Sequence, residues 1–403
     1  MSTSLLYHAF GTMGYQCTRT EYKSGQVTFH IQPGNHPLRC PNCGSTNVIR
    51  RGQRKRRFRT VPIGNKPVFI ILAFPRVGCR DCGIVRQVNI TFADERRSYT
   101  RAFERYVLDL SKMMTIQDVA HHLNVGWDMI KDIQKRHLLK HYAKPKLKHL
   151  RFLAVDEISV AKGHRYLTVV LDLESGAVVF VGDGKGADAL EPFFKRLRRS
   201  RAKIDAVAVD MSQAYIQAIK THLKDAAIVF DHFHVVKLLN DKLSKFRRDL
   251  QREANLLEKQ VLKGTRWLLL KNPENLDDTR NERQRLEAAL KINQPLATVY
   301  YMKEDLRQFW KQPNKFMAHS FLSDWIKRAL ASGITMLKKF AKLLGAYRTG
   351  LLAYYDYPIS TGPLEGANNK IKTMKRQAYG FRDMLFFKLK IMAIHEAKYA
   401  LVG

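Results

Sequence analysis

Three apolar runs decide the fold of this chain: R-F-L-A-V-D-E at Arg151–Glu157, I-D-A-V-A-V-D-M-S at Ile204–Ser212 and A-I-V-F-D-H-F-H at Ala227–His234. Each run is mainly apolar and has the length of a β-strand, which is typical of a sheet buried on both faces. In open α/β folds, ligands bind beyond the carboxyl ends of such strands. Each run reaches a carboxylate there: Asp156, Asp210 and Asp231.

These clustered acids indicate a site for hard divalent cations, because such ions prefer oxygen ligands. The chain has 403 residues, with 70 Lys and Arg against 36 Asp and Glu, which gives a net charge of +34. An excess of this size favours a polyanionic partner. We expect nucleic acid and not a membrane, because the sequence shows no basic amphipathic anchor and no signal peptide. The longest apolar run, Val68–Phe74, is too short to span a membrane.

The order of elements around the three runs predicts an RNase-H-like fold. The expected strands are joined by short turns at first and later by helices. We expect strands at Phe152–Val160, His164–Asp172, Ala177–Gly182, Ile204–Val209 and Ala227–Phe230, and helices at Asp188–Arg199 and Gln213–Leu223.

A helical insertion is expected next, from His234 to about Tyr357, with Trp267, Trp310 and Trp325 predicted to lie in its core. The last helix begins within S-T-G-P-L-E-G-A-N-N-K-I-K, where Pro363 suits the first helical position and either Thr361 or Gly362 the cap. Their spacing places three side chains on one face of that helix: Glu365, Lys372 and Arg376. A carboxylate followed by two cations on one face indicates a metal ligand beside a DNA backbone.

Two C-x-x-C pairs, each followed by glycine, precede these elements: C-P-N-C-G from Cys40 and C-R-D-C-G from Cys79. Four thiolates form a closed tetrahedral zinc site, with room for a β-hairpin between the pairs. Chance spacing or a redox pair would be the alternative. Between the pairs, the basic run Arg50–Arg59 is predicted to follow phosphates and not only to be a solvated surface. Its central members are Arg54, Lys55, Arg56 and Arg57.

A helix-turn-helix is expected between residues 115 and 137. Thr115 and Asp118 form a capping box, Asn124–Gly126 makes the turn, and a second helix begins at Trp127. An ordinary helical hairpin would be the alternative. On the second helix, the side chains expected to point outward are Asp128, Lys131, Asp132, Gln134 and Lys135, of which Lys131, Gln134 and Lys135 are candidates for DNA contacts.

Taken together, these motifs resemble those of the DDE transposases of bacterial insertion sequences, and most closely the ISL-type group. The resemblance covers nearly the whole chain and rests on both cysteine pairs, V-D-E, V-D-M-S-Q-A-Y, F-D-H-F-H-V-V-K and T-G-P-L-E-G-A-N-N-K-I-K. It implies an acidic triad of Asp156, Asp210 and Glu365 that holds two Mg²⁺ or Mn²⁺ ions, one structural Zn²⁺ on Cys40, Cys43, Cys79 and Cys82, and supporting roles for Asp231 and His234.

The predicted fold class is a multidomain α/β protein. Its domains would be a zinc ribbon at 1–95, a helix-turn-helix at 96–145, the first part of an RNase-H-like core at 146–234, an all-α insertion at 235–357 and the last core helices at 358–403. The resemblance implies double-stranded DNA as partner, both as terminal inverted repeats and as target. It also implies a homodimer in the bacterial cytoplasm, associated with the nucleoid.

The implied reaction is metal-dependent cleavage of a DNA strand followed by transfer of its 3′-hydroxyl to target DNA. Two other classes compete. A structure-directed nuclease would share the acids but would not need the zinc ribbon and helix-turn-helix. A DNA-binding regulator would share that front end but would not need the acids.

Overall fold

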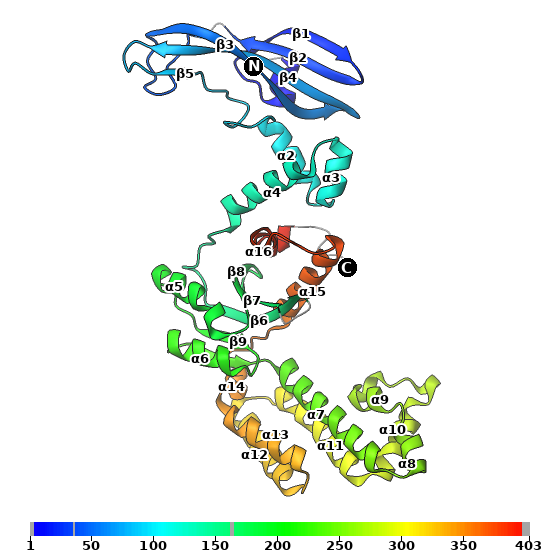
Figure 1. The fold of residues 1–403 in the computed structure, drawn as a ribbon. Helices are drawn as coiled ribbons and strands as arrows, with labels where there is room; N and C mark the ends of the chain where they lie inside the picture. Colours follow the sequence, from blue (N-terminus) through cyan, green and yellow to red (C-terminus); the bar gives the residue numbers. More distant parts are fainter. Residues whose placement is uncertain (1–3, 35–36, 162–164, 397–403) are drawn as a thin grey trace. The chain divides into compact units, whose positions relative to one another are not determined.

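The structure is a computed structural model that describes residues 4–34, 37–161 and 165–396 (Figure 1). Contacts divide the chain into two compact units. Unit 1 comprises residues 1–143 and 373–403, and unit 2 comprises residues 144–372. The five-domain division expected from the sequence stays a prediction.

A five-stranded sheet forms the first part of unit 1, with strand order β1-β2-β4-β3 and β5 paired to β4. The described residues 4–34, which carry little recognisable chemistry, supply β1, β2 and the short helix α1. Their apolar side chains, among them Phe10, Phe29 and Ile31, share one core with Phe58 and Ile70. The elements are α1 (Leu5–Phe10), β1 (Tyr15–Lys23), β2 (Gln26–Pro33), β3 (Val48–Ile63), β4 (Lys66–Cys79) and β5 (Val85–Gln87).

The predicted helix-turn-helix is present in unit 1 as α2 (Arg101–Leu110), α3 (Ile116–Leu123) and α4 (Trp127–Tyr142). The capping box of Thr115 and Asp118 forms as expected. Asn124 takes the left-handed conformation, with φ 49°, that turns the chain between the last two helices. Val119, Ile130 and other buried side chains fill the small core beneath them.

The outward face predicted for α4 is wrong at Gln134, which is only 4% exposed. Helix α16 (Met384–Met392) packs on this face, where Leu138 shares an apolar cluster with Phe386. Asp383, just before α16, forms ion pairs with Lys131 and Lys135 on α4, at 3.3 Å and 2.7 Å.

Unit 2 contains the predicted RNase-H-like sheet, with strand order β10-β9-β6-β7-β8. Strands β6, β7 and β8 pair antiparallel, and β9 and β10 continue the sheet in parallel from β6. The predicted start of the second strand, His164, lies outside the described residues. The elements are β6 (Phe152–Ala161), β7 (Arg165–Asp172), β8 (Val178–Asp183), η1 (Ala187–Ala189), α5 (Glu191–Ser200), β9 (Ala206–Val209), α6 (Gln213–His222) and β10 (Ala227–Phe230).

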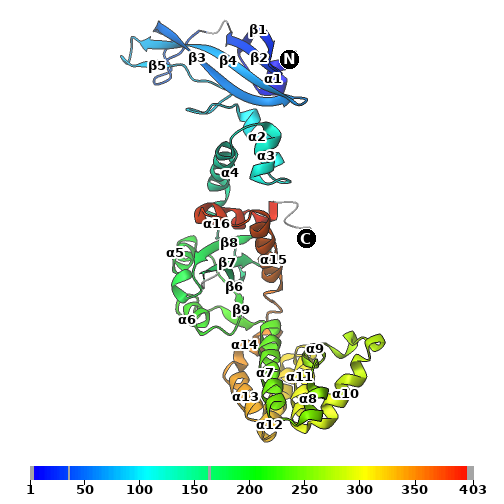
Figure 2. The same ribbon diagram turned by 45° about the vertical axis from the view of Figure 1, so that its right-hand side comes forward.

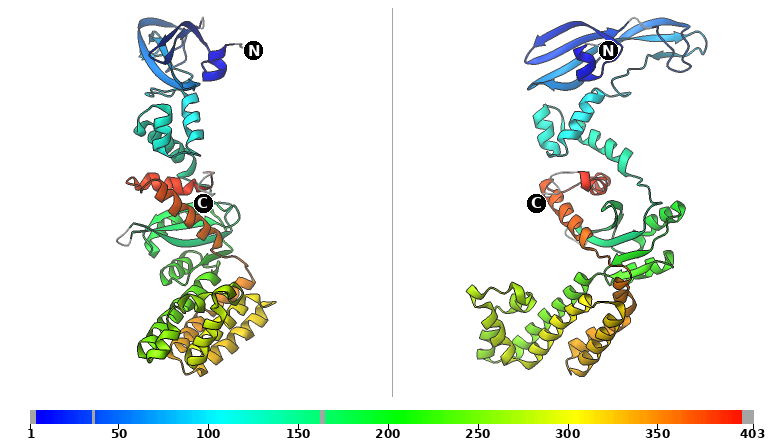
Figure 3. Two further views of the ribbon diagram at one scale, coloured as in Figure 1. Left: turned by 90° about the vertical axis from the view of Figure 1, so that its right-hand side faces the viewer. Right: turned by 180° about the vertical axis from the view of Figure 1, so that it is seen from behind.

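The insertion is helical as expected, and Figures 2 and 3 show its helices from further sides. Trp325 is fully buried and donates its indole N–H to the Met302 carbonyl at 2.9 Å. Trp310 is partly buried against the core, but the core position predicted for Trp267 is wrong, because this side chain is 63% exposed. The longer helices are α7 (His232–Glu253), α10 (Glu282–Ile292), α11 (Gln294–Leu306), α12 (Lys315–Ala331) and α13 (Thr335–Ala346).

The chain returns from the insertion through α14 (Arg348–Leu352), which lies against β10. Gly350 permits this approach, since a Cβ atom there would lie 2.4 Å from the Phe230 ring. Helix α15 (Gly362–Gln377) follows and begins one residue before Pro363, the predicted first helical position.

Candidate active site

Asp156 and Asp210 lie at the same edge of the sheet, on two neighbouring parallel strands. Asp210 directly follows β9, as predicted, whereas Asp156 lies within β6 and not at its end. The last paired residues of the two strands are Ala154 and Ala208, so each aspartate comes two residues later in the same register. Since adjacent strands are about 4.8 Å apart, this register brings the two carboxylates close together.

Hydrogen bonds fix the orientation of both carboxylates. Asp156 Oδ1 accepts from the backbone N–H of Glu157 at 2.8 Å. Its other oxygen, Oδ2, accepts from Nδ2 of Asn368 on α15, also at 2.8 Å. Asp210 Oδ1 accepts from the backbone N–H of Ser212 at 2.9 Å. The last helix of unit 2 therefore reaches the first aspartate, but through an amide and not through a carboxylate.

The charges around Asp156 show which other groups share this site. Burial raises the pKa of Asp156, His234 opposes this rise, and Asp210 adds to it; Lys237 has a smaller lowering effect. Burial also raises the pKa of Glu157, and the charges of Asp210 and Asp156 add to it. Three acids thus crowd together, with two basic side chains of α7 near enough to offset them in part.

Asp231 ties the start of the insertion to the residue before α15. This carboxylate is 2% exposed and caps α7, because its Oδ1 accepts from the backbone N–H of Phe233 at 2.8 Å. Its Oδ2 accepts from the backbone N–H of Thr361 at 2.7 Å and from the Thr361 hydroxyl. Thr361, a predicted cap of α15, thus donates its hydroxyl to a residue 130 positions earlier. Asp231 therefore links the start of α7 to the start of α15, and its supporting role at the site stays a prediction.

The side chain of Glu365 is exposed and forms no hydrogen bond or ion pair with the described residues, whereas its backbone N–H donates to the Thr361 carbonyl at 2.9 Å. It lies three residues before Asn368 on α15, and Lys372 is exposed on the same helix. Among the described residues, only the four cysteines form a group of three or more metal-binding side chains with ligand atoms within 4.8 Å. The structure therefore brings Asp156 and Asp210 together and leaves Glu365 about one helical turn from Asn368.

The four predicted zinc ligands converge at one point of unit 1. Cys40 Sγ is 3.7 Å from Cys82 Sγ, and Cys43 Sγ is 3.5 Å from Cys79 Sγ. A tetrahedral zinc ion with Zn–S bonds of about 2.3 Å would space its ligands by about 3.8 Å. The backbone N–H groups of Cys43 and Asn42 lower the pKa of Cys40 to about 7, whereas the hydrogen bond with Cys79 and burial raise the pKa of Cys43 to about 12. Opposite shifts are expected of thiols crowded together, and a bound cation would favour the thiolate at all four. Geometry and donor chemistry both fit one structural zinc ion.

The basic side chains of β3 differ in whether they form hydrogen bonds within the protein. Arg56 donates to the Arg97 carbonyl at 2.6 Å, and Arg57 donates to Gln26 Oε1 at 2.8 Å. Arg54 and Lys55 are exposed and have no such partner among the described residues. Arg54 lines a hollow of about 490 Å³ together with Gln53, Arg76, Val85, Arg86 and Gln87.

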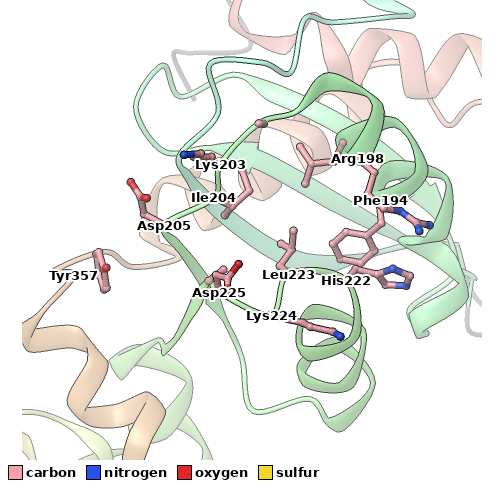
Figure 4. Close-up of a pocket in the computed structure, with 13 residues that line it drawn as sticks. Phe194, Arg198, Lys203, Ile204, Asp205, His222, Leu223, Lys224, Asp225 and Tyr357 are labelled. Atoms are coloured by element: carbon pink, nitrogen blue, oxygen red, sulfur yellow. The ribbon is translucent and has the colours of Figure 1, made fainter.

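A cavity of about 460 Å³ lies at the other end of the parallel strands in unit 2 (Figure 4). Its lining includes Lys203 and Asp205, just before β9, and Lys224, just before β10. Asp210 and Asp231 instead follow those two strands. The length of the strands separates the cavity from the aspartates, so it is not part of the candidate active site.

Comparison with known proteins defines the class of this site. A model of the DDE transposase domain of the ISL3 family, described as a transposase, matches residues 153–391. The helix-turn-helix domain of transposase family ISL3 matches residues 88–138. The zinc-finger of the IS204/IS1001/IS1096/IS1165 transposases matches residues 36–82. The paired aspartates therefore lie in a DDE-type transposase domain, which follows a zinc ribbon and a helix-turn-helix.

Full-length relatives agree with these matches. The transposase for insertion sequence element IS1001 of Bordetella parapertussis is 34% identical over 95% of this chain and 96% of its own length. The IS1557 transposase of Mycobacterium tuberculosis is 28% identical over 89% of this chain and 86% of its own. The Drosophila P element transposase strand transfer complex matches with a TM-score of 0.40 and 10% identity, over 76% of this chain and 94% of that chain. The chain belongs to the ISL3 family of transposases.

Asn368 and Lys237 are the site residues that the sequence analysis missed. Both stand inside motifs that were quoted for other residues, L-E-G-A-N-N and F-D-H-F-H-V-V-K. Asn368 comes three residues after Glu365, and a helical projection places it on the side of the helix that faces the protein core. That position was the available signal, but an amide is neutral and does not by itself indicate a cation site.

None of the helices in the described residues is long and apolar enough to cross a membrane.

Proposed function

We propose that this chain binds the terminal inverted repeats of its own insertion sequence and catalyses metal-dependent strand cleavage and strand transfer. The observation that carries this proposal is the pairing of Asp156 and Asp210 on adjacent parallel strands, with α15 bonded to the first of them. Two carboxylates at one edge of the sheet supply part of a cation site, and Glu365 on α15 would supply the third carboxylate.

Asp156, Asp210 and Glu365 would hold two Mg²⁺ or Mn²⁺ ions. When bound, these ions activate a water or a 3′-hydroxyl and stabilise the leaving oxygen of the phosphodiester. The buried carbonyl oxygen of Asn368, which has no partner among the described residues, supports the fit of an oxygen-ligated cation beside Asp156.

The chain's own residues orient this chemistry. Glu157 N–H and Asn368 fix the two oxygens of Asp156, so that the carboxylate is held before any substrate arrives. Asp231 holds Thr361 and thereby fixes the start of α15, which carries Glu365. His234 offsets part of the negative charge at the sheet edge. A site whose groups are already in place reorganises little during reaction.

DNA would be held by basic side chains that form no ion pair with the described residues. Arg54, Arg76 and Arg86 come from three different strands and surround one hollow without a carboxylate, as a phosphate group requires. Lys372 and Arg376 would contact the backbone beside Glu365. Since α16 covers Lys131, Gln134 and Lys135, base contacts from these three residues are not part of the proposal.

Further parts of the proposal concern the state and place of the protein. Transposition joins two element ends, so we assign a homodimer that pairs them. The net charge of +34 supports association with DNA, and the proposal includes a location at the nucleoid in the bacterial cytoplasm.

The test compares cleavage with end binding. The substrate is a plasmid that carries both ends of the insertion sequence encoding this chain. Glu365→Gln keeps the shape of the side chain but removes its charge, so cleavage in Mg²⁺ should fall by several orders of magnitude while binding of the end fragments persists. Glu174→Gln, an exposed glutamate in a turn of unit 2, is the matched control and should cleave normally.

Three outcomes would contradict the proposal. Normal cleavage by Glu365→Gln would place the third ligand elsewhere, with Glu157 or Asp231 as the next candidates. Cleavage of branched DNA without preference for the element ends would favour a structure-directed nuclease. End binding without any cleavage by the wild-type protein in Mg²⁺ or Mn²⁺ would favour a DNA-binding regulator.

A further inference from the structure

Asn368 is the residue of α15 that reaches the candidate active site. Its side chain is 5% exposed, and its Nδ2 donates to Asp156 Oδ2 at 2.8 Å. Its carbonyl oxygen Oδ1 is buried and has no hydrogen-bond partner among the described residues. The neighbouring Asn369, by contrast, is exposed on the outer side of the same helix.

The chemistry of the pair fixes which way the amide faces. An ionised carboxylate can only accept hydrogen bonds, so Asn368 must present its NH₂ group to Asp156. The carbonyl oxygen of Asn368 is then the atom left without a hydrogen-bond partner in the described part of the chain. A buried carbonyl without a partner is costly, and nearly all such oxygens in folded proteins are satisfied. The described residues therefore leave this oxygen free to bind a ligand.

Two properties of the surroundings define that partner. The nearby ionisable groups are the carboxylates of Asp156, Asp210 and Glu157, whose mutual repulsion calls for positive charge. An amide carbonyl is an oxygen ligand of the kind that hard divalent cations accept beside carboxylates. His234 and Lys237 supply positive charge from α7, but neither forms a hydrogen bond to Asn368.

We propose that Asn368 belongs to the metal site in two ways. Its NH₂ group positions Asp156, and its carbonyl oxygen supplies a further oxygen ligand to a divalent cation held by Asp156 and Asp210. This inference rests on the proposed function, because it requires the cation site at this edge of the sheet. It differs from that proposal in assigning a neutral side chain of α15, in addition to Glu365, to the metal.

The test measures Mn²⁺ binding by the full-length, zinc-loaded protein, using the paramagnetic resonance signal of free Mn²⁺. Asn368→Ala removes both functions and should weaken binding by about 10- to 100-fold, the range typical of groups that support metal ligands. Asn368→Asp keeps an oxygen ligand and adds charge, so it should bind Mn²⁺ within a few-fold of the wild type. Asn369→Ala is the matched control and should bind normally. Thermal melts without Mn²⁺ verify that each variant is folded.

The remaining outcomes separate this inference from the proposed function. Wild-type Mn²⁺ affinity in Asn368→Ala, with affinity lost in Asp156→Asn, overturns the role of Asn368 and leaves the cation site standing. Equal weakening in Asn368→Ala and Asn368→Asp overturns the ligand role of the carbonyl oxygen. Unchanged affinity in Asp156→Asn overturns the cation site itself, and with it both proposals.

Discussion

Thr361→Val tests whether one buried hydrogen bond holds the start of α15 in place. Valine has nearly the shape of threonine but lacks the hydroxyl, so the substitution removes one of the two bonds from Thr361 to Asp231. Both residues are 2% exposed, which means that water cannot replace the lost donor without local opening. The helix should then detach more readily from the insertion's first turn.

The magnitude follows from the type of bond. A hydrogen bond to a charged group contributes about 1.5–3 kcal/mol, and each 1.36 kcal/mol corresponds to a tenfold change in an equilibrium. The local opening of α15 should therefore become roughly 10- to 150-fold more frequent. Asp231→Ala should do more, since it also removes the cap of α7 and leaves the Phe233 N–H without its acceptor.

Hydrogen exchange followed by mass spectrometry measures this opening in the full-length protein. Thr361→Val should speed exchange in a peptide covering residues 358–372 and leave residues 232–238 unchanged, whereas Asp231→Ala should speed both. Thr349→Val, at an exposed threonine of α14, is the control and should change neither. Unchanged exchange at 358–372 in Thr361→Val would refute the argument.

Three further predictions concern unit 1. Removing zinc with a chelator should locally unfold the zinc ribbon, seen as faster exchange at 37–90, because four thiolates cannot pack together without the ion; unchanged exchange would contradict this. The Lys135 ammonium is the main cause that lowers the pKa of Asp383 to about 2. This pKa lies below the unfolded value of about 3.9, so the ion pairs with Lys135 and Lys131 stabilise α16 above pH 4 and are lost as pH falls toward 2. Asp383→Asn should lower the melting temperature at pH 7, and this difference should shrink as the pH falls from 4 through about 2; a constant difference would contradict it. Arg76→Gln should weaken binding of the element ends and reduce the salt slope by roughly 1 unit, whereas Lys23→Gln should reduce neither; equal slopes would contradict it.

The sequence predicted the sheet of unit 2 well because its signals are local. A strand buried on both faces is an unbroken apolar run, and the runs before Asp210 and Asp231 end where the strands end. The capping box at Thr115 and the spacing of the cysteines are also local patterns with few alternatives. Each of these features depends on neighbouring residues, which a single sequence displays directly.

Contacts between distant segments escaped prediction. The spacing along α4 shows that Gln134 lies opposite the core of the helix-turn-helix, but not that α16, about 250 residues later, covers it. The bond between Asn368 and Asp156 likewise joins residues 212 positions apart. Strands β1 and β2 lack a long apolar run, because only alternate side chains of β2 are buried and β1 is mostly exposed.

The position of Asp231 explains how a long insertion can interrupt the domain without loosening it. Closing a flexible loop costs an entropy that grows only with the logarithm of its length, so a long insertion costs little more than a short one if its ends are held. Here the chain leaves the sheet after Phe230 and returns at Thr361, and a single buried carboxylate bonds to both points. The contact of Gly350 with Phe230 brings the returning chain to the same strand. The position of α15, and hence of Asn368 and Glu365, is therefore set at the base of the insertion.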